Sequence, residues 1–349
     1  MATLPHKTGR PGRRATIREI ADLAGVSIAT VSRVVNGSGY VSEKTRIAVE
    51  SVIREHRYTA NRSARALSAG RTGLVGVTLP RIHPAYFSEI TAGIAEALYE
   101  LDMRIVLAPT LHEHDREVDL LERLMHGTTD GALLVLPEES GSELRTLMTY
   151  GYRFVVVDPR RRIDERVATV SAAHSSGADQ ATRHLLELGH RRIAAITGPP
   201  DMMATEERLR GYRAALAAAG VPADASLVVE SDWEVDGGRR AGAALLELPD
   251  PPTAIFAFND PLAIGAMQSI VAGGLRVPQD VSVVGFDDTV EAEFVTPRLT
   301  TVRQPLAEMG RMGVSLLMRL LENRSFEALH VELATQLIVR ASTGPAPVR

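Results

Sequence analysis

The chain has 349 residues, about twice the size of a typical single domain, which predicts two or three domains. Hydrophobic residues make up 45% and charged residues 23%, as is typical of globular proteins. No apolar run reaches the roughly 18–20 residues of a membrane helix, and the Arg- and Gly-rich N-terminus lacks the apolar stretch of a signal peptide. The absence of cysteine excludes disulfides, thiolate zinc sites and cysteine nucleophiles.

The net charge of −4 is divided unevenly along the chain. Residues 1–72 contain thirteen Lys and Arg against five Asp and Glu, a net charge of +8, so the remaining residues carry −12. A small basic module on a larger acidic body indicates an anionic polymer as the partner of the module alone. From charge alone, a solvated basic tail explains the pattern equally well.

Two short helices joined by a turn are predicted near the N-terminus. Thr16, followed three residues later by Glu19, is a capping-box pattern that begins a helix. Gly25 permits the positive φ of a helix end, and Ser27 can cap the next helix. A third helix is predicted to start near Ser42. Its residues predicted to face a small core are Thr45, Ala48, Val49, Val52 and Ile53. The pattern therefore predicts a helix-turn-helix.

The second helix has the composition of a recognition helix. If Val31 is buried, its other side faces outward, where such a helix meets base edges in the major groove. Arg33 can contact guanine through two hydrogen bonds, whereas Ile28 and Ala29 offer only apolar contact, for example to a thymine methyl group. The predicted DNA contacts of this module are Thr16, Ser27, Ile28, Ala29, Ser32, Arg33 and Asn36. The alternative is a three-helix module that packs against another protein.

The segment after the third helix predicts a helix of about two turns. Asn61 can cap it, and Arg62 and Arg65 lie beside an apolar edge formed by Ala64 and Leu67. Because so short a helix is marginal alone in water, we expect it to fold against DNA or against the same segment of a second chain. Leu67 is then a candidate wedge for a minor-groove base step. Asn61, Arg62, Ala64 and Leu67 complete the predicted DNA contacts, and a plain linker is the alternative.

From Leu74 onward, apolar strand-like runs alternate with helical patterns. The predicted strands are 74–79, 104–108, 132–136, 154–158, 192–197, 226–230, 254–258 and 282–286. The predicted helices lie near 88–100, 115–126, 141–150, 175–188, 205–219, 236–247 and 261–273. Continuous apolar runs predict strands buried on both faces, hence parallel sheets in doubly wound α/β domains. Two similar halves in tandem imply a cleft between them, with ligand residues at the strand ends.

Polar side chains follow three of the predicted strands. Asp158 ends one, Asn259 and Asp260 follow another, and Asp287 and Asp288 follow a third. Carboxylates and amides that converge with an Arg and aromatic rings suit a polyhydroxylated ligand such as a sugar. Each of these residues could instead cap the helix or turn that follows. We expect Asn259 and Asp287 to contact ligand, and Asp260 and Asp288 to act as caps.

Three motifs between Ala15 and Leu67 carry a family resemblance: A-G-V-S-I-A-T-V-S-R-V-V-N-G, V-S-E-K-T-R and A-N-R-S-A-R-A-L. The stretch resembles the DNA-binding headpiece and hinge helix of the LacI–GalR family of bacterial transcription regulators. The resemblance implies that the hinge helices of a dimer enter the minor groove, where a leucine pair (here Leu67) opens the central step. Ile28 and Ala29 fall on the variable recognition positions and resemble the galactose-repressor branch more than the lactose repressor. Upstream, G-R-P-G-R-R resembles an AT-hook core, but we expect a disordered basic arm there.

The resemblance extends through the acidic body to about Arg340, through motifs such as H-L-L-E-L-G-H-R-R-I-A, E-R-L-R-G-Y and V-P-Q-D-V-S-V-V-G-F-D-D. It implies a two-lobed, periplasmic-binding-protein-like core. The effector-binding residues that the resemblance implies are Tyr86, Phe87, Asp158, Arg208, Trp233, Asn259, Asp287 and Gln304. There are two departures from the family pattern: His83 replaces an Asn, and Ala173-His174 replaces an Asp-Asn pair. Both are expected to line the cleft and indicate an unusual effector.

Catalytic and cofactor motifs are absent from the sequence. It has no Walker motif, dinucleotide fingerprint or G-x-S-x-G elbow, so we predict no enzyme activity and no cofactor. The run His112-Glu113-His114-Asp115 lacks the spacing of a helical zinc pair, so no metal is predicted, and Asp115 is expected to cap the following helix. His190 is expected to be a structural loop residue.

Together these features predict a cytoplasmic, nucleoid-associated repressor. It would bind a palindromic operator as a homodimer under the control of a small-molecule effector, a sugar, and would not contact membranes. The tail lacks leucine heptads, so no tetramerising coiled coil is predicted. The alternative is a solute-binding protein of a sugar uptake system, against which the headpiece and the lack of a secretion signal argue. The predicted division is 1–14 basic arm, 15–60 headpiece, 61–72 hinge, 73–340 core and 341–349 flexible tail, with the core split into a first subdomain (73–171 and 305–328) and a second (172–302 and 329–340).

Overall fold

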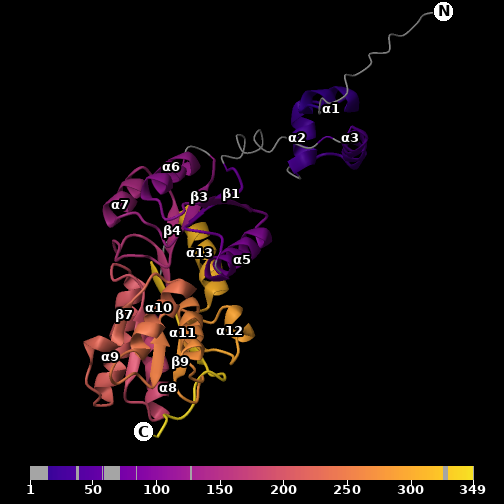
Figure 1. Ribbon diagram of the computed structural model, residues 1–349. Coiled ribbons are helices and arrows are strands. Elements are labelled where there is room, and N and C mark those ends of the chain that lie inside the picture. The colour runs from indigo at the N-terminus through magenta and orange to yellow at the C-terminus, as the bar shows by residue number, and fades with distance from the viewer. Residues whose placement is uncertain are drawn as a thin grey trace, which may run out of the picture. The chain divides into compact units, whose positions relative to one another are not determined.

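The structure is a computed structural model of the full chain. It describes residues 15–36, 39–56, 58, 71–83, 85–125, 128–324 and 329–348. The chain divides into two units, Met1–Thr72 and Gly73–Arg349, here called the N-terminal unit and the core unit. Figure 1 labels many of the helices and strands of each unit. The predicted basic arm, 1–14, lies outside the described residues.

The N-terminal unit contains the three predicted helices. They are α1 (Ile17–Ala24), α2 (Ile28–Asn36) and α3 (Glu43–Glu55). The capping box of Thr16 with Glu19 is confirmed, and Gly25 ends α1 with a φ of 64°. Ser27 Oγ accepts a hydrogen bond from the N–H of Thr30 at 3.1 Å, as a cap should. The buried core residues are few, which suits so small a unit. They are Ile20, Ala21, Val31 and Val49. Ala48 is exposed, contrary to prediction, because α3 turns a narrower face inward.

The core unit contains two six-stranded sheets, which define its two lobes (Figure 1). The first lobe has the strand order β11-β5-β4-β3-β1-β2, and the second has the order β12-β10-β9-β8-β6-β7. The strands of the first sheet are β1 (Leu74–Leu79), β2 (Arg104–Pro109), β3 (Gly131–Val135), β4 (Phe154–Val157), β5 (Thr169–Ala172) and β11 (His330–Leu333). Those of the second are β6 (Ile193–Thr197), β7 (Val228–Glu230), β8 (Ala254–Ala257), β9 (Ser282–Asp287), β10 (Thr300–Arg303) and β12 (Gln336–Ile338). All pairings are parallel except that of β10 with β12, which confirms the predicted parallel α/β architecture.

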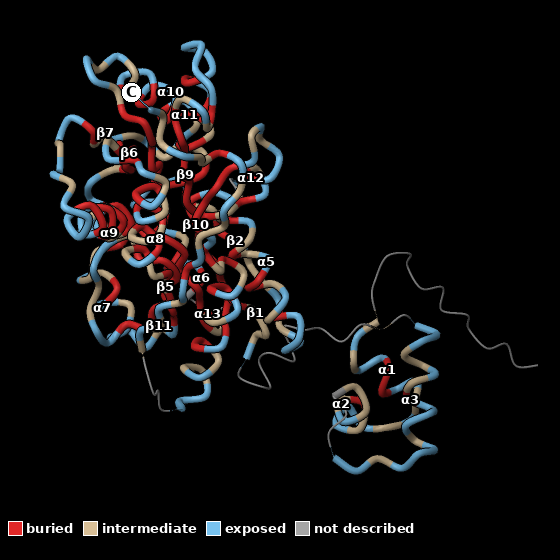
Figure 2. Tube along the Cα trace, turned by 90° about the horizontal axis from the view of Figure 1, so that it is seen from below, coloured by how far each residue is buried: buried red, intermediate tan, exposed pale blue. Residues whose placement is uncertain are grey.

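Helices cover both faces of each sheet. In the first lobe, α5 (Ala85–Glu100) and α13 (Leu306–Leu321) pack on one face, and α6 (His114–Met125) and α7 (Gly141–Thr149) on the other. In the second lobe, α8 (His174–Glu187) and α9 (Met203–Ala218) cover one face. The opposite face carries α10 (Val235–Leu246) and α11 (Asp260–Ala272), and the one-turn helix α12 (Glu291–Phe294) follows β9. Figure 2 shows the central strands between these layers as buried, and the strands at the sheet edges are more exposed. Such double coverage accounts for the continuous apolar strands in the sequence.

The chain passes between the lobes three times. It leaves the first sheet after β5, returns between β10 and α13, and crosses again between β11 and β12. The last crossing shows that one predicted boundary is wrong. The sequence pattern places residues 329–340 in the second subdomain, whereas 330–333 pair in parallel with β5 of the first lobe. The segment is short and has only half-buried apolar residues, so the sequence pattern did not identify it as a strand.

The C-terminal tail is packed onto the second lobe, contrary to the prediction of a flexible tail. Ser342 is completely buried, and its hydroxyl accepts from the N–H of Thr300 at 2.8 Å and donates to the carbonyl of Val283 at 2.6 Å. The backbone of Gly344 accepts from His190 Nε2 at 3.1 Å. His190 also bonds to the hydroxyls of Thr253 and Ser282, so it is structural as predicted.

In the described part of the chain, no helix is both long and apolar enough to cross a bilayer.

Ser342→Ala should lower the stability of the core unit by about 1–3 kcal/mol, because it leaves a buried N–H without its acceptor. Denaturant unfolding followed by circular dichroism measures the change. Ser88→Ala, on the exposed side of α5, is the matched control and should change stability by less than about 0.5 kcal/mol. Equal stabilities of the two variants would contradict a packed tail.

Candidate functional site

The outward side of α2 carries the predicted DNA-contacting residues. Ser27, Ile28, Ala29 and Arg33 are exposed, and Ser32 is half-buried. Thr16 is exposed at the start of α1. Asn36 is the last residue of α2, and its side chain, like Asn61, Arg62, Ala64 and Leu67, lies outside what the structure describes. The helix-turn-helix therefore presents a surface of the predicted composition.

A cavity of about 670 Å³ lies between the two lobes of the core unit. Its walls come from the segments that follow the C-terminal ends of strands in both sheets, which is where open α/β sheets bind ligands. The residues lining it are Arg81, His83, Ala85, Tyr86, Phe87, His112, Leu136, Glu138, Asp158, Arg160, Pro199, Met202, Ala204, Arg208, Asp232, Trp233, Glu234, Val235, Asn259, Pro261, Ile264, Asp287, Thr289 and Glu291. Its volume lies within the usual range of small-molecule sites.

Seven of the eight predicted effector-binding residues line this cavity: Tyr86, Phe87, Asp158, Arg208, Trp233, Asn259 and Asp287. Gln304 does not. It is buried behind Asp287 and donates to its Oδ1 at 2.7 Å. His83 lines the cavity as expected, but Ala173 and His174 do not. His174, the first residue of α8, is buried behind the cavity-lining Asp158 and Arg208, which it contacts at 3.1 Å and 3.3 Å.

Arg208 is the buried cation at the centre of the site. It projects from α9, with an exposed fraction of 3%, and Nη1 donates to the carbonyl of Phe258. Its guanidinium carbon lies 3.8 Å from the centre of the Phe286 ring, and Nη2 lies 3.7 Å from Asp287 Oδ1. Burial lowers the pKa of Arg208, while the charges of Asp287 and Asp158 raise it. An arginine remains charged even so, so the site holds a fixed positive charge.

The two carboxylates that flank Arg208 have different environments. Burial raises the pKa of Asp158, but hydrogen bonds from His174 and Tyr86 and the charge of Arg208 outweigh it and leave the pKa below its ordinary value. Burial raises the pKa of Asp287 to about 7, although Arg208 and Gln304 act in the opposite direction. Burial and the neighbouring Asp158 raise the pKa of Tyr86 well above its ordinary value, so the phenol stays protonated and donates. The site therefore offers donors and acceptors together.

Strained backbone is concentrated at this cavity. Of the nine non-glycine residues with positive φ in the described chain, five line it: His112, Leu136, Asp158, Trp233 and Asp287. Non-glycine residues rarely adopt positive φ, and such strain persists where the surrounding structure enforces it, commonly at functional sites. The strand ends thus turn sharply to bring their side chains into the cavity.

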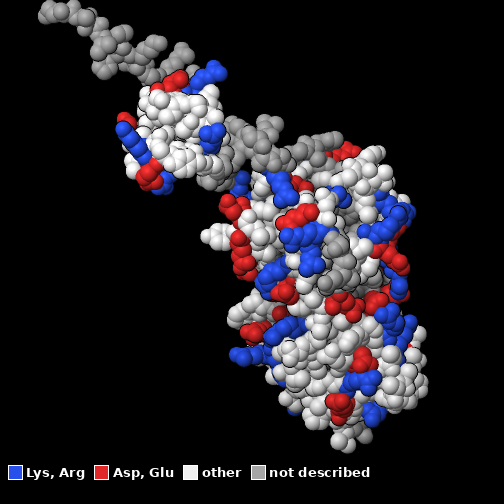
Figure 3. Space-filling model, turned by 180° about the vertical axis from the view of Figure 1, so that it is seen from behind, with Lys and Arg blue, Asp and Glu red and all other residues white. Residues whose placement is uncertain are grey.

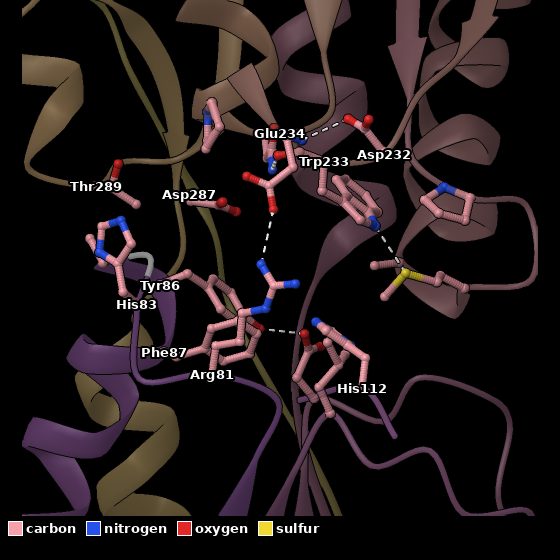
Figure 4. A pocket seen from close by; sticks show the side chains of 18 of the residues that line it. Arg81, His83, Tyr86, Phe87, His112, Asp232, Trp233, Glu234, Asp287 and Thr289 are labelled. Atoms are coloured by element: carbon pink, nitrogen blue, oxygen red, sulfur yellow. Dashed lines mark hydrogen bonds and ion pairs between the residues drawn. The ribbon is translucent and has the colours of Figure 1, made fainter. Parts of the chain in front are cut away.

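Trp233 forms the aromatic wall. Its Nε1 donates to Met202 Sδ at 2.9 Å, an interaction drawn in Figure 4. The ring packs on Gly198, where a Cβ atom would lie 2.0 Å from it, so only glycine is tolerated there. Asn259 Nδ2 donates to the Trp233 carbonyl at 2.9 Å, while Oδ1 caps α11 through the N–H of Leu262. Asn259 is thus a cap as well as a cavity residue.

The two predicted caps have other roles. Asp260 is completely buried and accepts from the N–H of Thr289 at 2.8 Å, which fixes the loop after β9. Asp288 forms ion pairs with Arg303 at 2.7 Å and Arg340 at 2.6 Å. Asp115 lies inside the first turn of α6 and does not cap it. The predicted caps are wrong at these positions, because the local sequence does not show which of two adjacent polar residues precedes the first turn of a helix.

Ion pairs at the cavity were missed from the sequence. Arg81 of the first lobe faces Glu234 of the second at 3.7 Å across the cavity (Figure 4). Arg160 contacts Glu138 in its own lobe and Asp201 of the second lobe, the latter at 3.1 Å. Each cavity-lining member of these pairs follows a strand end by two to four residues. The rule that identified Asp158 could therefore have found them.

The two histidines of the 112–115 run, His112 and His114, do not converge on a common site. His112 lies 3.3 Å from Glu138, whereas His114 lies 2.9 Å from Glu143. In the described part of the chain, no three His, Cys, Asp or Glu side chains are grouped to hold a metal ion.

Figure 3 shows acidic and basic side chains interspersed over one face of the core unit, so the negative charge of this unit is not gathered into one area of that face.

A helix-turn-helix unit joined to a two-lobed α/β core with a polar cleft is the architecture of ligand-binding transcription regulators. Residues 16–61 match the family described as "Bacterial regulatory proteins, lacI family", and residues 182–343 match a "Periplasmic binding protein-like domain". The chain is 39% identical to the HTH-type transcriptional regulator CelR of Thermobifida fusca, over 95% of this chain and 98% of that protein. The chain belongs to the lacI family of bacterial regulatory proteins.

Two solved structures are similar over nearly the whole chain. A transcriptional regulator CelR–cellobiose complex is 38% identical with a TM-score of 0.73, covering 94% of this chain and 100% of that chain. The lac repressor dimer bound to operator and the anti-inducer ONPF is 28% identical with a TM-score of 0.86, covering 95% of this chain and 100% of that chain. The fold of both units is therefore that of the family.

Asp287→Asn should stabilise the core unit increasingly as the pH rises from about 4 to 7. In the wild type, Asp287 has a raised folded-state pKa of about 7, so its favourable contribution is complete below its unfolded pKa and is lost as the pH rises through 7. Each pKa unit corresponds to about 1.4 kcal/mol, which gives a difference of a few kcal/mol above pH 7. Thermal melts at several pH values measure it, and a constant difference across this range would contradict the raised pKa.

Proposed function

We propose that this protein is a transcriptional repressor that binds a pseudo-palindromic operator as a homodimer. In this proposal, a sugar bound in the cleft between the lobes controls operator affinity. The observation that carries the proposal is the joint construction of the cleft: Asp158 comes from the first lobe, and Arg208 and Asp287 come from the second. A ligand that contacts all three senses the relative position of the lobes.

The DNA-binding part of the proposal rests on α2. Its exposed side combines Arg33, a residue suited to guanine, with the apolar Ile28 and Ala29, which suit a thymine methyl group. The capped helix N-termini and Ser27 supply phosphate contacts. A two-fold dimer would place two such helices on half-sites about one helical turn apart, which requires a palindromic site. The similarity to a lac repressor dimer bound to operator supports this arrangement.

The sugar part of the proposal rests on the chemistry of the cleft. Carboxylates accept hydrogen bonds from hydroxyl groups, Arg208 donates, and Trp233 and Phe87 offer apolar faces to a pyranose or furanose ring. The similarity to a cellobiose complex of CelR supports a sugar over other polar metabolites.

Coupling to DNA would follow from a shift between lobe arrangements. A ligand that binds one arrangement more tightly shifts the population toward it, and DNA binding shifts in turn. The pairs Arg81–Glu234 and Arg160–Asp201 cross from one lobe to the other, so they belong to the arrangement seen here and would rearrange in another. Such a regulator would act in the cytoplasm, at the nucleoid. A sugar-uptake binding protein shares the core but has no use for α2.

Arg33→Ala should relax the preference for guanine at one operator position by about 1–3 kcal/mol, because it removes a two-bond contact to the base edge. Gel shifts with an operator selected from genomic fragments, and with its point variants, measure the change. Arg18→Ala, at an exposed position of α1, is the control and should weaken all sequences alike. A uniform loss with Arg33→Ala would make Arg33 a phosphate contact.

Arg208→Ala should abolish the effect of sugar on operator binding and leave DNA binding without sugar within about threefold. The substitution removes the buried guanidinium of the cavity, which should weaken sugar binding by more than about 2 kcal/mol. Trp233 is the only tryptophan in the chain and lines the cavity, so its fluorescence reports binding directly. Arg213→Ala, on the exposed side of the same helix α9, should leave the response intact. A normal response in Arg208→Ala would overturn the cleft assignment.

A further inference from the structure

His174 is buried where the two lobes meet, with an exposed fraction of 2%. It occupies the first position of α8, directly after the chain leaves the first lobe. Its Nε2 lies 3.1 Å from Oδ1 of Asp158, a first-lobe residue. Its Nδ1 lies 3.4 Å from Nε and 3.3 Å from Nη2 of Arg208, a second-lobe residue. The imidazole therefore stands between the two charged groups that we assign to ligand binding.

The hydrogen-bond partners of this ring select one tautomer of the neutral imidazole. A guanidinium has only donors, so Nδ1 of His174 must be the acceptor toward Arg208. The proton of the neutral ring is then on Nε2, where it is donated to Asp158. Tyr86 donates its hydroxyl to the other oxygen of the same carboxylate. Asp158, which lines the cavity, is held from two sides, and each of its oxygens can accept a further hydrogen bond.

The same contacts occupy the edge of Arg208 that usually binds anions. Arginine takes up a carboxylate or phosphate through two parallel N–H groups, most often as a fork. In this structure the Nε and Nη2 edge is directed at His174, and Nη1 donates to the carbonyl of Phe258. Nη2 also faces Asp287 at 3.7 Å. The guanidinium is thus left with single N–H groups for a ligand and no unoccupied Nε–Nη2 fork.

The charge around the cavity points the same way. Six carboxyl groups line it, against three guanidinium groups. Two of those three, Arg81 and Arg160, are already paired with carboxylates. An anionic ligand would meet more carboxyl than guanidinium groups and no unoccupied Nε–Nη2 fork, whereas a neutral polyol needs only single donors and acceptors.

We propose that His174 is a specificity-determining residue that reserves the cleft for uncharged polyhydroxylated ligands and excludes their phosphorylated and carboxylated derivatives. It acts as a positioning residue through Arg208 and Asp158 and does not itself line the cavity. This inference rests on the proposed function, because it concerns the ligand of the same cleft. It goes beyond that function by defining the charge of the ligand and the residue that selects it.

The test uses the full chain, with Trp233 fluorescence and calorimetry as readouts and cellobiose, glucose, glucose 6-phosphate, glucuronate and inorganic phosphate as probes. The wild type should prefer a neutral sugar over the anionic probes by about tenfold or more. His174→Ala and the more space-filling His174→Phe both remove the Nδ1 acceptor and free the fork. Each should lose affinity for neutral sugars and gain at least about tenfold in affinity for the anionic probes.

Two further variants separate selection from simple packing. His174→Gln keeps an acceptor for Arg208 and a donor for Asp158, so it should restore the neutral preference to within about threefold. His184→Ala, a half-buried position of the same helix, should leave the preference unchanged. If His174 has a purely structural role, its replacement should weaken the binding of neutral and anionic probes alike. That result in either the Ala or the Phe variant, whichever folds, would overturn the proposal.

The inorganic phosphate arm separates this proposal from the proposed function. If the wild type binds no sugar, the proposed sugar effector is wrong. The comparison of phosphate binding between the wild type and the His174 variants still tests the role of His174. Phosphate binding gained by His174→Ala or His174→Phe and absent from the wild type would support the inference that His174 occupies the Nε–Nη2 edge of Arg208. Phosphate binding of equal strength in the wild type, or in none of the proteins, would overturn it.

Discussion

The pairing of the buried Arg208 guanidinium is the interaction that organises the floor of the cleft between the two lobes. A buried charge is tolerated only when it is paired and hydrogen-bonded. The partners of Arg208 come from both lobes. Asp287 and the Phe258 carbonyl belong to the second lobe, and Asp158 of the first lobe is linked to Arg208 through His174. The two lobes are therefore joined by electrostatics at the floor of the cleft as well as by the three crossing segments of the chain.

The same requirement explains why the site can act as a sensor. The strand ends that supply Asp158, Trp233 and Asp287 are held at positive φ, so these groups are fixed in position before a ligand arrives. Cross-lobe pairs such as Arg81–Glu234 are more exposed and individually weak. A rigid floor under weak cross-lobe contacts allows a ligand of modest affinity to change the balance between lobe arrangements, which links the cleft chemistry to the proposed control of DNA binding.

Much of the fold could be predicted from local patterns. The capping box at Thr16, the turn at Gly25 and the apolar strands of both sheets depend on side chains within a few residues of one another. Strand β11 and the packed tail could not be predicted, because their partners lie far away along the chain, from 42 residues for Thr300 to more than 150 for β5 and His190. The same limit applies to His174, whose role depends on contacts with Asp158 and Arg208 that the sequence does not display.

By itself, the sequence determined the two-unit organisation, the helix-turn-helix, the doubly wound core and the edge at which polar residues gather. Periodicity, capping and charge are local properties, and parallel strands place all their carboxyl ends on one edge. Only the tertiary structure decided which of those polar residues face the cavity, which support it from behind, as Gln304 and His174 do, and which pair across the lobes. Those roles depend on packing between segments far apart in the chain, where burial, rather than sequence position, sets the charge and direction of each group.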